Sequence, residues 1–235
     1  MKRPIILVLA LIWALPLTVV ANDGLQTESF VSVRAYTIPD TLQRVPIPYH
    51  FLEAVRVMDG FRGYFQLNND DYALALNLWA TEEQAVASNE MARSNISENT
   101  PGLLEHPPTF VVGASAVSFV DVPDVMEDQY LQLYASLRVY AGFTDVKVGA
   151  FVTLVEKVFQ PLIRDTEHFF AYYVIHDSAG RLVTVSVFHE QVRDIVADYL
   201  SAFLPDPELV VSGRLDIAAL AGVIDAANLV ETQQP

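Results

Sequence analysis

Hydrophobic and polar residues alternate along several short segments of the chain, which is the pattern of β-strands. Residues 32–36 read Ser-Val-Arg-Ala-Tyr and residues 136–140 read Ser-Leu-Arg-Val-Tyr, so in each segment Ser, Arg and Tyr share one face. Two further matches follow in the same order, Tyr64-Phe65 with Tyr172-Tyr173 and Val111-Val112 with Val210-Val211. The three offsets are 104, 108 and 99 residues. This repetition indicates one domain present twice.

Each copy is predicted to run strand–helix–strand–strand–helix–strand. In the first copy the strands are expected at 30–38, 62–67, 72–79 and 109–119, and the helices at 48–58 and 81–94. In the second copy the strands are expected at 133–140, 169–175, 182–188 and 209–216, and the helices at 144–162 and 190–203. Pro161 is expected to bend or end the earlier of these two helices. A short further helix is predicted at 220–230.

The first residues have the pattern of a leader. Met1-Lys2-Arg3 is basic, residues 4–20 are apolar, and the small residue Ala21 follows, which is typical of a cleaved signal peptide and of export to the periplasm or the exterior. A retained membrane anchor is the alternative, because the apolar run is nearly long enough to cross a bilayer. After cleavage we expect no membrane span. The remaining divisions are a unit at 25–120, a linker at 121–129, a second unit at 130–219 and a tail at 220–235.

Charge and cysteine content exclude several classes of function. Loss of Lys2 and Arg3 with the leader leaves 12 basic against 29 acidic residues, a net charge near −17. Nucleic acid and anionic membrane surfaces are therefore not expected partners, because both are bound by excess positive charge. The chain contains no cysteine, which excludes disulfides, thiolate metal sites and cysteine nucleophiles.

Several passages resemble the antibiotic-biosynthesis-monooxygenase-like domains. They are Gln-Pro-Leu-Ile-Arg at 160–164, Phe-Phe-Ala-Tyr at 169–172, Asp-Gly-Phe-Arg-Gly-Tyr at 59–64, and the tryptophan that leads into a helix at 79–85. The resemblance implies an α+β fold in which two ferredoxin-like βαββαβ units form a dimeric α+β barrel. Because both units lie in one chain, the barrel is expected to be an intramolecular dimer and the protein a monomer.

The two faces of each strand differ in character. Val31, Val33 and Ala35 form an aliphatic face, which we expect to pack beneath the helices. The opposite, mixed faces are expected between two sheets that pack on each other, and they supply the candidate ligand-binding residues: Arg34, Tyr36, Asn77 and Trp79 in the first copy, and Arg138 and Tyr140 in the second. A buried arginine needs a carboxylate partner or an anionic ligand, and both possibilities remain open here.

Candidate catalytic groups are few. The resemblance implies a histidine on the second helix, but Ser88 and Ala197 occupy the corresponding positions. His189, at the end of a strand beside Glu190, is a further candidate and, among the histidines, the one best placed to serve as a haem ligand. The histidines show no spacing typical of a metal site, and the chain lacks a phosphate loop, a dinucleotide fingerprint and a nucleophile elbow.

These observations favour an exported, non-catalytic module that binds a small hydrophobic or aromatic molecule or serves as a scaffold. No cofactor is expected. The alternatives are a cofactor-independent monooxygenase acting on an aromatic or quinol-like substrate, which the family resemblance implies, and a haem-binding protein. Any ligand is expected in the first copy, near Trp79, because Asn77 and Trp79 give that copy the more polar and aromatic set.

Overall fold

The computed structural model describes residues 29–40, 42, 45, 49–120, 133–164, 169–189, 200–220 and 224–225. The expected leader (1–21), the expected linker (121–129) and most of the helix expected at 190–203 lie outside the described residues. Within the described part of the chain, no helix combines the length and the apolar character needed to span a membrane.

Unit 1 is the first βαββαβ arrangement. Its elements are β1 (Phe30–Thr37), α2 (Tyr49–Arg56), β2 (Phe61–Asn68), β3 (Tyr72–Trp79), α3 (Glu82–Asn99), a single 3-10 turn η1 (Pro101–Leu104) and β4 (Thr109–Val120). Helix α3 begins with a capping box, in which the side chains of Thr81 and Gln84 each accept a hydrogen bond from the other residue's backbone amide. The helix continues past its expected end at residue 94.

Unit 2 repeats this order as far as it is described. Its elements are β5 (Leu133–Tyr140), α4 (Asp145–Leu154), a π-helical turn η2 (Val155–Phe159), α5 (Gln160–Arg164), β6 (Phe169–His176), β7 (Leu182–His189), β8 (Leu209–Leu220) and β9 (Ile224–Asp225). Pro161 was expected to bend or end the helix, and it does not end it, because helical structure continues to Arg164. The wider π turn just before Pro161 lets the chain continue through a residue that has no amide hydrogen. The helix expected at 220–230 was also wrong at Leu220 and at 224–225, which form strand.

The strands of both units join into one closed barrel of eight strands, with the order β2-β3-β1-β4-β6-β7-β5-β8 and a return pairing of β8 with β2. The two seams between the units are antiparallel, from Ala114–His176 along β4–β6 and from Gly63–Leu220 along β2–β8. The predicted fold class, a dimeric α+β barrel within one chain, is confirmed. The prediction of two separate sheets stacked face to face was wrong, because the unpaired edges of each unit pair with the other unit.

The strand register also corrects the sequence alignment of the two copies. Val33 pairs with Val111 in unit 1, and Leu137 pairs with Val211 in unit 2. Since Val33 and Leu137 correspond, Val111 corresponds to Val211, so the last strands are offset by 100 residues and not by 99.

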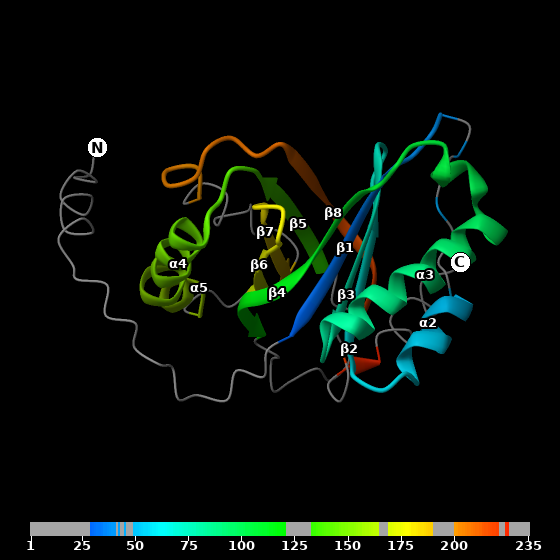
Figure 1. Cartoon of the computed structure of the whole chain (residues 1–235), viewed down its shortest axis with the longest axis horizontal. Coiled ribbons are helices and arrows are strands. Elements are labelled where there is room, and N and C mark those ends of the chain that lie inside the picture. Colours follow the sequence, from blue (N-terminus) through cyan, green and yellow to red (C-terminus); the bar gives the residue numbers. More distant parts are fainter. Residues whose placement is uncertain are drawn as a thin grey trace.

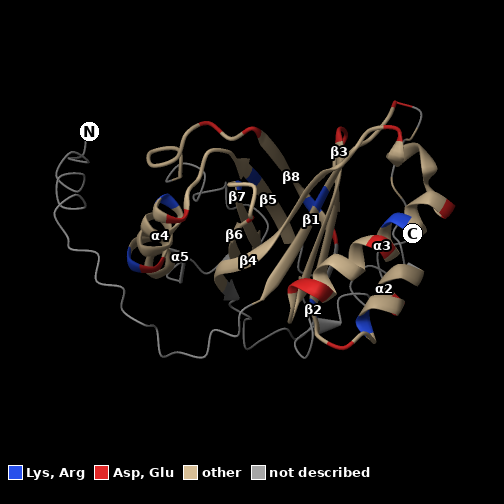
Figure 2. Ribbon diagram, in the orientation of Figure 1, with Lys and Arg blue, Asp and Glu red and all other residues tan. Residues whose placement is uncertain are grey.

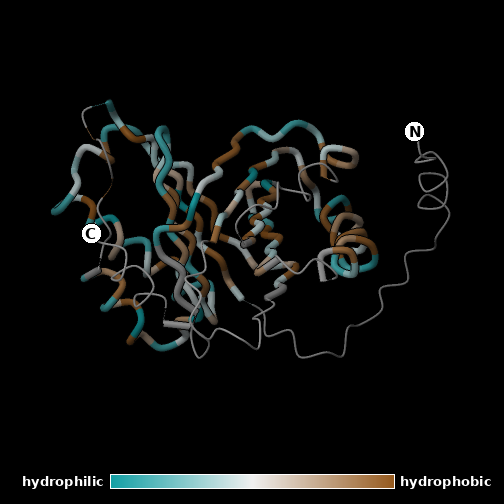
Figure 3. Tube along the Cα trace, turned by 180° about the vertical axis from the view of Figure 1, so that it is seen from behind, coloured by the Kyte–Doolittle hydropathy of each residue, from teal (hydrophilic) through white to brown (hydrophobic). Residues whose placement is uncertain are grey.

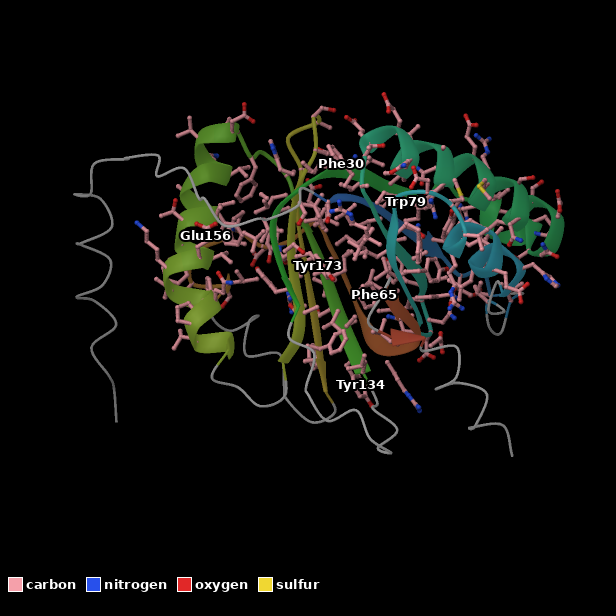
Figure 4. All side chains as sticks on the ribbon, turned by 90° about the horizontal axis from the view of Figure 1, so that it is seen from below. Phe30, Phe65, Trp79, Tyr134, Glu156 and Tyr173 are labelled. Carbon is pink, nitrogen blue, oxygen red and sulfur yellow. The ribbon has the colours of Figure 1, made fainter. Side chains whose placement is uncertain are left out.

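The aliphatic faces fill the interior of the barrel, and not the space beneath the helices as predicted. Val31, Val33 and Ala35 belong to a single interior cluster with the aliphatic residues of β3, β5 and β7. Figure 4 labels Phe65 and Tyr173, which come from different units and lie in this interior with ring centroids 6.2 Å apart. An eight-stranded barrel is just wide enough for side chains to fill, so the most uniformly apolar faces pack inside it.

The mixed faces consequently point outward, toward the helices. Helices α2 and α3 cover unit 1, and α4 and α5 cover unit 2 on the opposite side of the barrel (Figure 1). Charged residues gather on the helices and connecting segments, whereas the strands carry few (Figure 2). In Figure 3 brown segments alternate with paler ones along the central strands. The candidate residues Arg34 and Arg138 therefore lie on the outward faces of β1 and β5, in different units, and do not meet on an axis between two sheets.

Candidate functional site

A cavity of about 280 Å³ lies between the sheet of unit 1 and its helices. Its apolar wall consists of Val45, Ala73, Leu74, Ala75, Ile96 and Leu103. Its polar wall consists of Tyr36, His50, Tyr64, Gln66, Asn95, Asn99 and Thr100. The strands β1, β2 and β3 form its floor, and the C-terminal half of α3 forms its roof.

Two small residues on β3 explain why the cavity exists in unit 1. Ala73 pairs with Tyr36, and Ala75 pairs with Arg34. At the equivalent register positions of unit 2, Leu182 pairs with Tyr140 and Thr184 pairs with Arg138. Leu182 and Tyr140 are both buried in the cluster that packs beneath α4. The larger side chains of β7 fill the space that the two alanines leave open.

Two tyrosines provide hydroxyl groups at the floor of the cavity. Tyr64 donates a hydrogen bond to Gln66 Oε1 at 2.7 Å, and both residues line the cavity. Burial raises the pKa of both Tyr36 and Tyr64. The positive charge of Arg34 lowers both values, but its effect is smaller than that of burial. Both side chains are therefore neutral phenols near neutral pH. Tyr36 can donate a hydrogen bond to a ligand, whereas Tyr64 already donates its hydroxyl hydrogen to Gln66 and can only accept.

Arg34 is the buried cation of this face, with an exposed fraction of 3%. Its Nε donates to Asn89 Oδ1 at 2.7 Å, its Nη2 donates to the same oxygen, and Nη2 also lies 3.3 Å from Ser88 Oγ. Ser32 Oγ donates to Asn89 Oδ1 as well, at 2.7 Å. The resemblance implied a histidine at position 88, and the serine found there instead accepts from the guanidinium.

Asn77 and Trp79 lie farther along β3, both with an exposed fraction of 0%. Asn77 pairs with Ser32 on one side and with Tyr64 on the other. Neither side-chain atom of Asn77, nor Nε1 of Trp79, has a hydrogen-bond partner among the described residues. Trp79 packs edge-to-face on Phe61 at 5.6 Å, on the side of the barrel that α2 and α3 cover (Figure 4).

The structure thus brings some of the predicted residues to the cavity and leaves others away from it. Tyr36 lines the cavity, and Arg34 lies next to it on the same strand face. Asn77 and Trp79 share that face but do not line the cavity, which opens at the other end of β3, near Ala73. Arg138 and Tyr140 are buried in unit 2, and the side chain of His189 lies outside the described residues.

Sequence reasoning missed Tyr64, Gln66 and the polar residues of α3. Tyr64 and Gln66 alternate along β2 and so share a face, which is the kind of signal that identified Arg34 and Tyr36. Asn95 and Asn99 are four residues apart and lie on one side of α3. The described residues include no group of three or more His, Cys, Asp or Glu side chains arranged to hold a metal ion.

The sequence matches no family model, and no curated protein matches it. Among solved structures, a candidate monooxygenase from Lactobacillus acidophilus NCFM matches with a TM-score of 0.54 at 8% identity, over 84% of this chain and 98% of that chain. A candidate monooxygenase from Fusobacterium nucleatum subsp. nucleatum matches with a TM-score of 0.57 at 10% identity, over 84% and 96% of the two chains. These likenesses show a shared dimeric α+β barrel fold.

Proposed function

We propose that this protein binds a small ring compound in the cavity of unit 1 and does not transform it. The observation that carries the proposal is the cavity itself, in which an apolar wall faces a short row of hydrogen-bonding groups. This combination is typical of small-molecule sites, where apolar contact provides affinity and a few polar groups fix the orientation. Tyr36, Tyr64 and Gln66 are the polar groups that the strands β1 and β2 supply to the floor.

The size of the cavity supports a ligand of one or two rings. Pockets for drug-sized molecules usually enclose roughly 300–1,000 Å³. The cavity of unit 1, at about 280 Å³, lies just below that range. A molecule of tetrapyrrole size is therefore disfavoured as its occupant.

The absence of a suitable base among the lining residues favours binding over catalysis. A general base works best with a pKa near the operating pH, and of the side chains that line the cavity only histidine has an ordinary pKa in that range. His50 is the one histidine of the lining, and its side chain is 99% exposed beside Glu53. It therefore lies at the rim, away from the floor where a ring would bind.

Isothermal titration calorimetry with 1-naphthol tests this proposal. Ala73→Leu introduces at the cavity floor the side chain that unit 2 carries at Leu182, so it should fill the cavity without disturbing the fold. Ala87→Leu adds the same side chain to the exposed surface of α3 and is the matched control. We expect the wild type and Ala87→Leu to bind alike, and Ala73→Leu to bind at least about ten-fold more weakly, a loss of about 1.4 kcal/mol.

Two results would contradict the proposal. If neither 1-naphthol nor another naphthalene probe binds the wild type, or if 1-naphthol binds Ala73→Leu equally well, the cavity of unit 1 is not a site for ring compounds. Oxygen uptake can also be measured with 1,4-naphthohydroquinone. If the wild type consumes oxygen faster than the uncatalysed reaction and Ala73→Leu does not, the protein is a cofactor-independent monooxygenase and not a simple binding protein. The fold shared with candidate monooxygenases is the reason to include that assay.

A further inference from the structure

Arg34 has no carboxylate within ion-pair distance among the described residues, although it is almost completely buried. Its hydrogen bonds go to an amide oxygen and a hydroxyl group, which are neutral. The sequence had left two possibilities for this arginine, a carboxylate partner or an anionic ligand. The described residues do not provide the first.

An uncompensated buried cation is costly. Removing a charge from water costs several kcal/mol, and neutral hydrogen-bond partners recover only part of that cost. Burial accordingly lowers the pKa of Arg34, and Tyr36 and Tyr64 oppose this effect only in part. An oxyanion placed beside the guanidinium would offset this cost directly.

The guanidinium is held in a fixed orientation. Asn89 accepts from Nε and Nη2, and Ser88 is a further acceptor for Nη2. No acceptor for the third nitrogen, Nη1, is found among the described residues. Hydrogen bonds from Nε and Nη2 therefore fix the orientation of the guanidinium, and Nη1 remains available to donate to a ligand.

Arg34 lies just outside the lining of the cavity, beside its inner end at Ala75. Ala75 pairs with Arg34 across β1–β3 and with Gln66 across β2–β3, and Ala75 and Gln66 both line the cavity. The two cavity tyrosines are close enough to be affected by its charge. Beyond Arg34, Asn77 is fully buried with both side-chain atoms unpartnered among the described residues, so this layer has unused hydrogen-bonding capacity.

We propose that the ligand of the unit 1 cavity is a ring compound that carries a carboxylate, and that Arg34 binds this carboxylate at the inner end of the cavity. The inference rests on the proposed function, because it specifies the chemical class of the ligand for the same site. The ring lies between the apolar wall and Tyr36, and the carboxylate accepts from Nη1 of the guanidinium. Asn89 and Ser88 are positioning residues, since they act on the ligand only through Arg34.

The first test compares two probes of nearly equal shape, 1-naphthoate and 1-naphthamide, by calorimetry on the wild-type full chain at neutral pH. Hydrogen bonds to charged groups contribute about 1.5–3 kcal/mol. We therefore expect 1-naphthoate to bind roughly 10- to 100-fold more tightly than 1-naphthamide. This comparison needs no variant, so it is decisive even if changes at Arg34 prevent folding.

The second test changes the arginine. In Arg34→Gln the affinity for 1-naphthoate should fall at least ten-fold while that for 1-naphthamide stays the same. Arg34→Lys should retain part of the preference, since lysine keeps the charge but loses the planar fork. Arg138→Gln is the matched control, because Arg138 holds the equivalent register position in unit 2, opposite Thr184 instead of Ala75. It should leave both affinities unchanged.

The outcomes separate the two proposals. Equal binding of the two probes, or binding of 1-naphthoate that is unaffected in Arg34→Gln, overturns the carboxylate inference and leaves the ring-binding function intact. Failure of 1-naphthol, 1-naphthamide and 1-naphthoate alike overturns both. Preference for the carboxylate that depends on Arg34 alone supports both.

Discussion

Truncation of Leu182 to alanine tests the explanation for why only unit 1 has an open site. Leu182 has an exposed fraction of 0% and packs with Phe143, Phe151 and Tyr140 beneath α4. Its counterpart in unit 1 is Ala73, which lines the cavity. If Leu182 fills the corresponding space in unit 2, its removal should leave a void with a large energetic cost.

The cost can be worked out from the burial. Leu182→Ala removes three buried carbon atoms, and at about 0.8 kcal/mol each the lost transfer free energy is about 2.4 kcal/mol. The void left behind adds to this, so the free energy of unfolding should fall by about 3–4 kcal/mol. For a chain of this length the melting temperature should fall by roughly 2–4 °C for each kcal/mol, or about 10 °C in total.

Denaturation in urea, followed by far-ultraviolet circular dichroism, gives the free energy of unfolding directly. Leu162→Ala is the matched control, because it makes the same chemical change at a side chain that is 45% exposed in α5. We expect it to cost about 1 kcal/mol or less. A loss below about 1 kcal/mol for Leu182→Ala would refute the reasoning, because it would mean that β7 does not fill the space beneath α4.

Other predictions concern stability and assembly. Tyr173→Phe should leave the free energy of unfolding unchanged or raise it by about 1 kcal/mol, because the buried hydroxyl of Tyr173 has no partner among the described residues. Tyr64→Phe should lower it by about 1 kcal/mol, because Tyr64 donates a hydrogen bond to Gln66. Urea titrations of the two variants measure both effects. Burial raises the pKa of Tyr64 and Tyr173, so the folded protein holds their protons more tightly than the unfolded chain does. The free energy of unfolding should therefore be constant below about pH 10, where tyrosine ionises in the unfolded chain, and should decrease at higher pH. In the variant with both tyrosines changed to Phe, this decrease should be less steep. Gly60→Ala should cost more than about 1 kcal/mol in the same titrations, because Gly60 has a φ of +79° and a Cβ there would lie 2.0 Å from Gln84 Oε1, in the capping box. Light scattering should give the mass of one chain, since the seams β4–β6 and β2–β8 pair the unit edges internally; twice that mass would contradict it.

The element order could be predicted because its signals are local. Alternation along 32–36 and 136–140 identifies strands, and helical spacing identifies α3 and α4, without knowledge of distant contacts. The repeat then doubles each signal. The π turn before Pro161 could not be predicted in this way, because a proline by itself indicates only that a regular α-helix is unfavourable there.

The facing of the strands was predicted the wrong way round. Alternation shows that Val33 and Arg34 point to opposite sides, but it does not show which side is the interior. That depends on pairing between residues far apart, such as Ala114 with His176, which closes the barrel around the aliphatic faces. The polar face is tolerated beneath a helix because α3 supplies Ser88 and Asn89 as partners for Arg34.

The candidate site was predicted in part for the same reason. Arg34 and Tyr36 are two residues apart on one strand, so the sequence placed them on the same face. In the structure Tyr36 lines the cavity and Arg34 lies next to it. The importance of Ala73 and Ala75 could not be seen, since a small residue signals a cavity only when its cross-strand neighbours are known. Trp79, the expected centre of the site, is instead packed on Phe61.

The seam between β2 and β8 has a consequence for the order of events during folding. It joins Gly63 to Leu220 and Leu67 to Leu215, pairings that span most of the chain. Such distant contacts form late, because closing a long loop lowers the entropy of the chain before the new contacts stabilise it. Until β8 arrives, β2 presents an open edge that another nascent chain could pair with. The protein should therefore fold slowly, and its refolding yield should fall as the chain concentration rises.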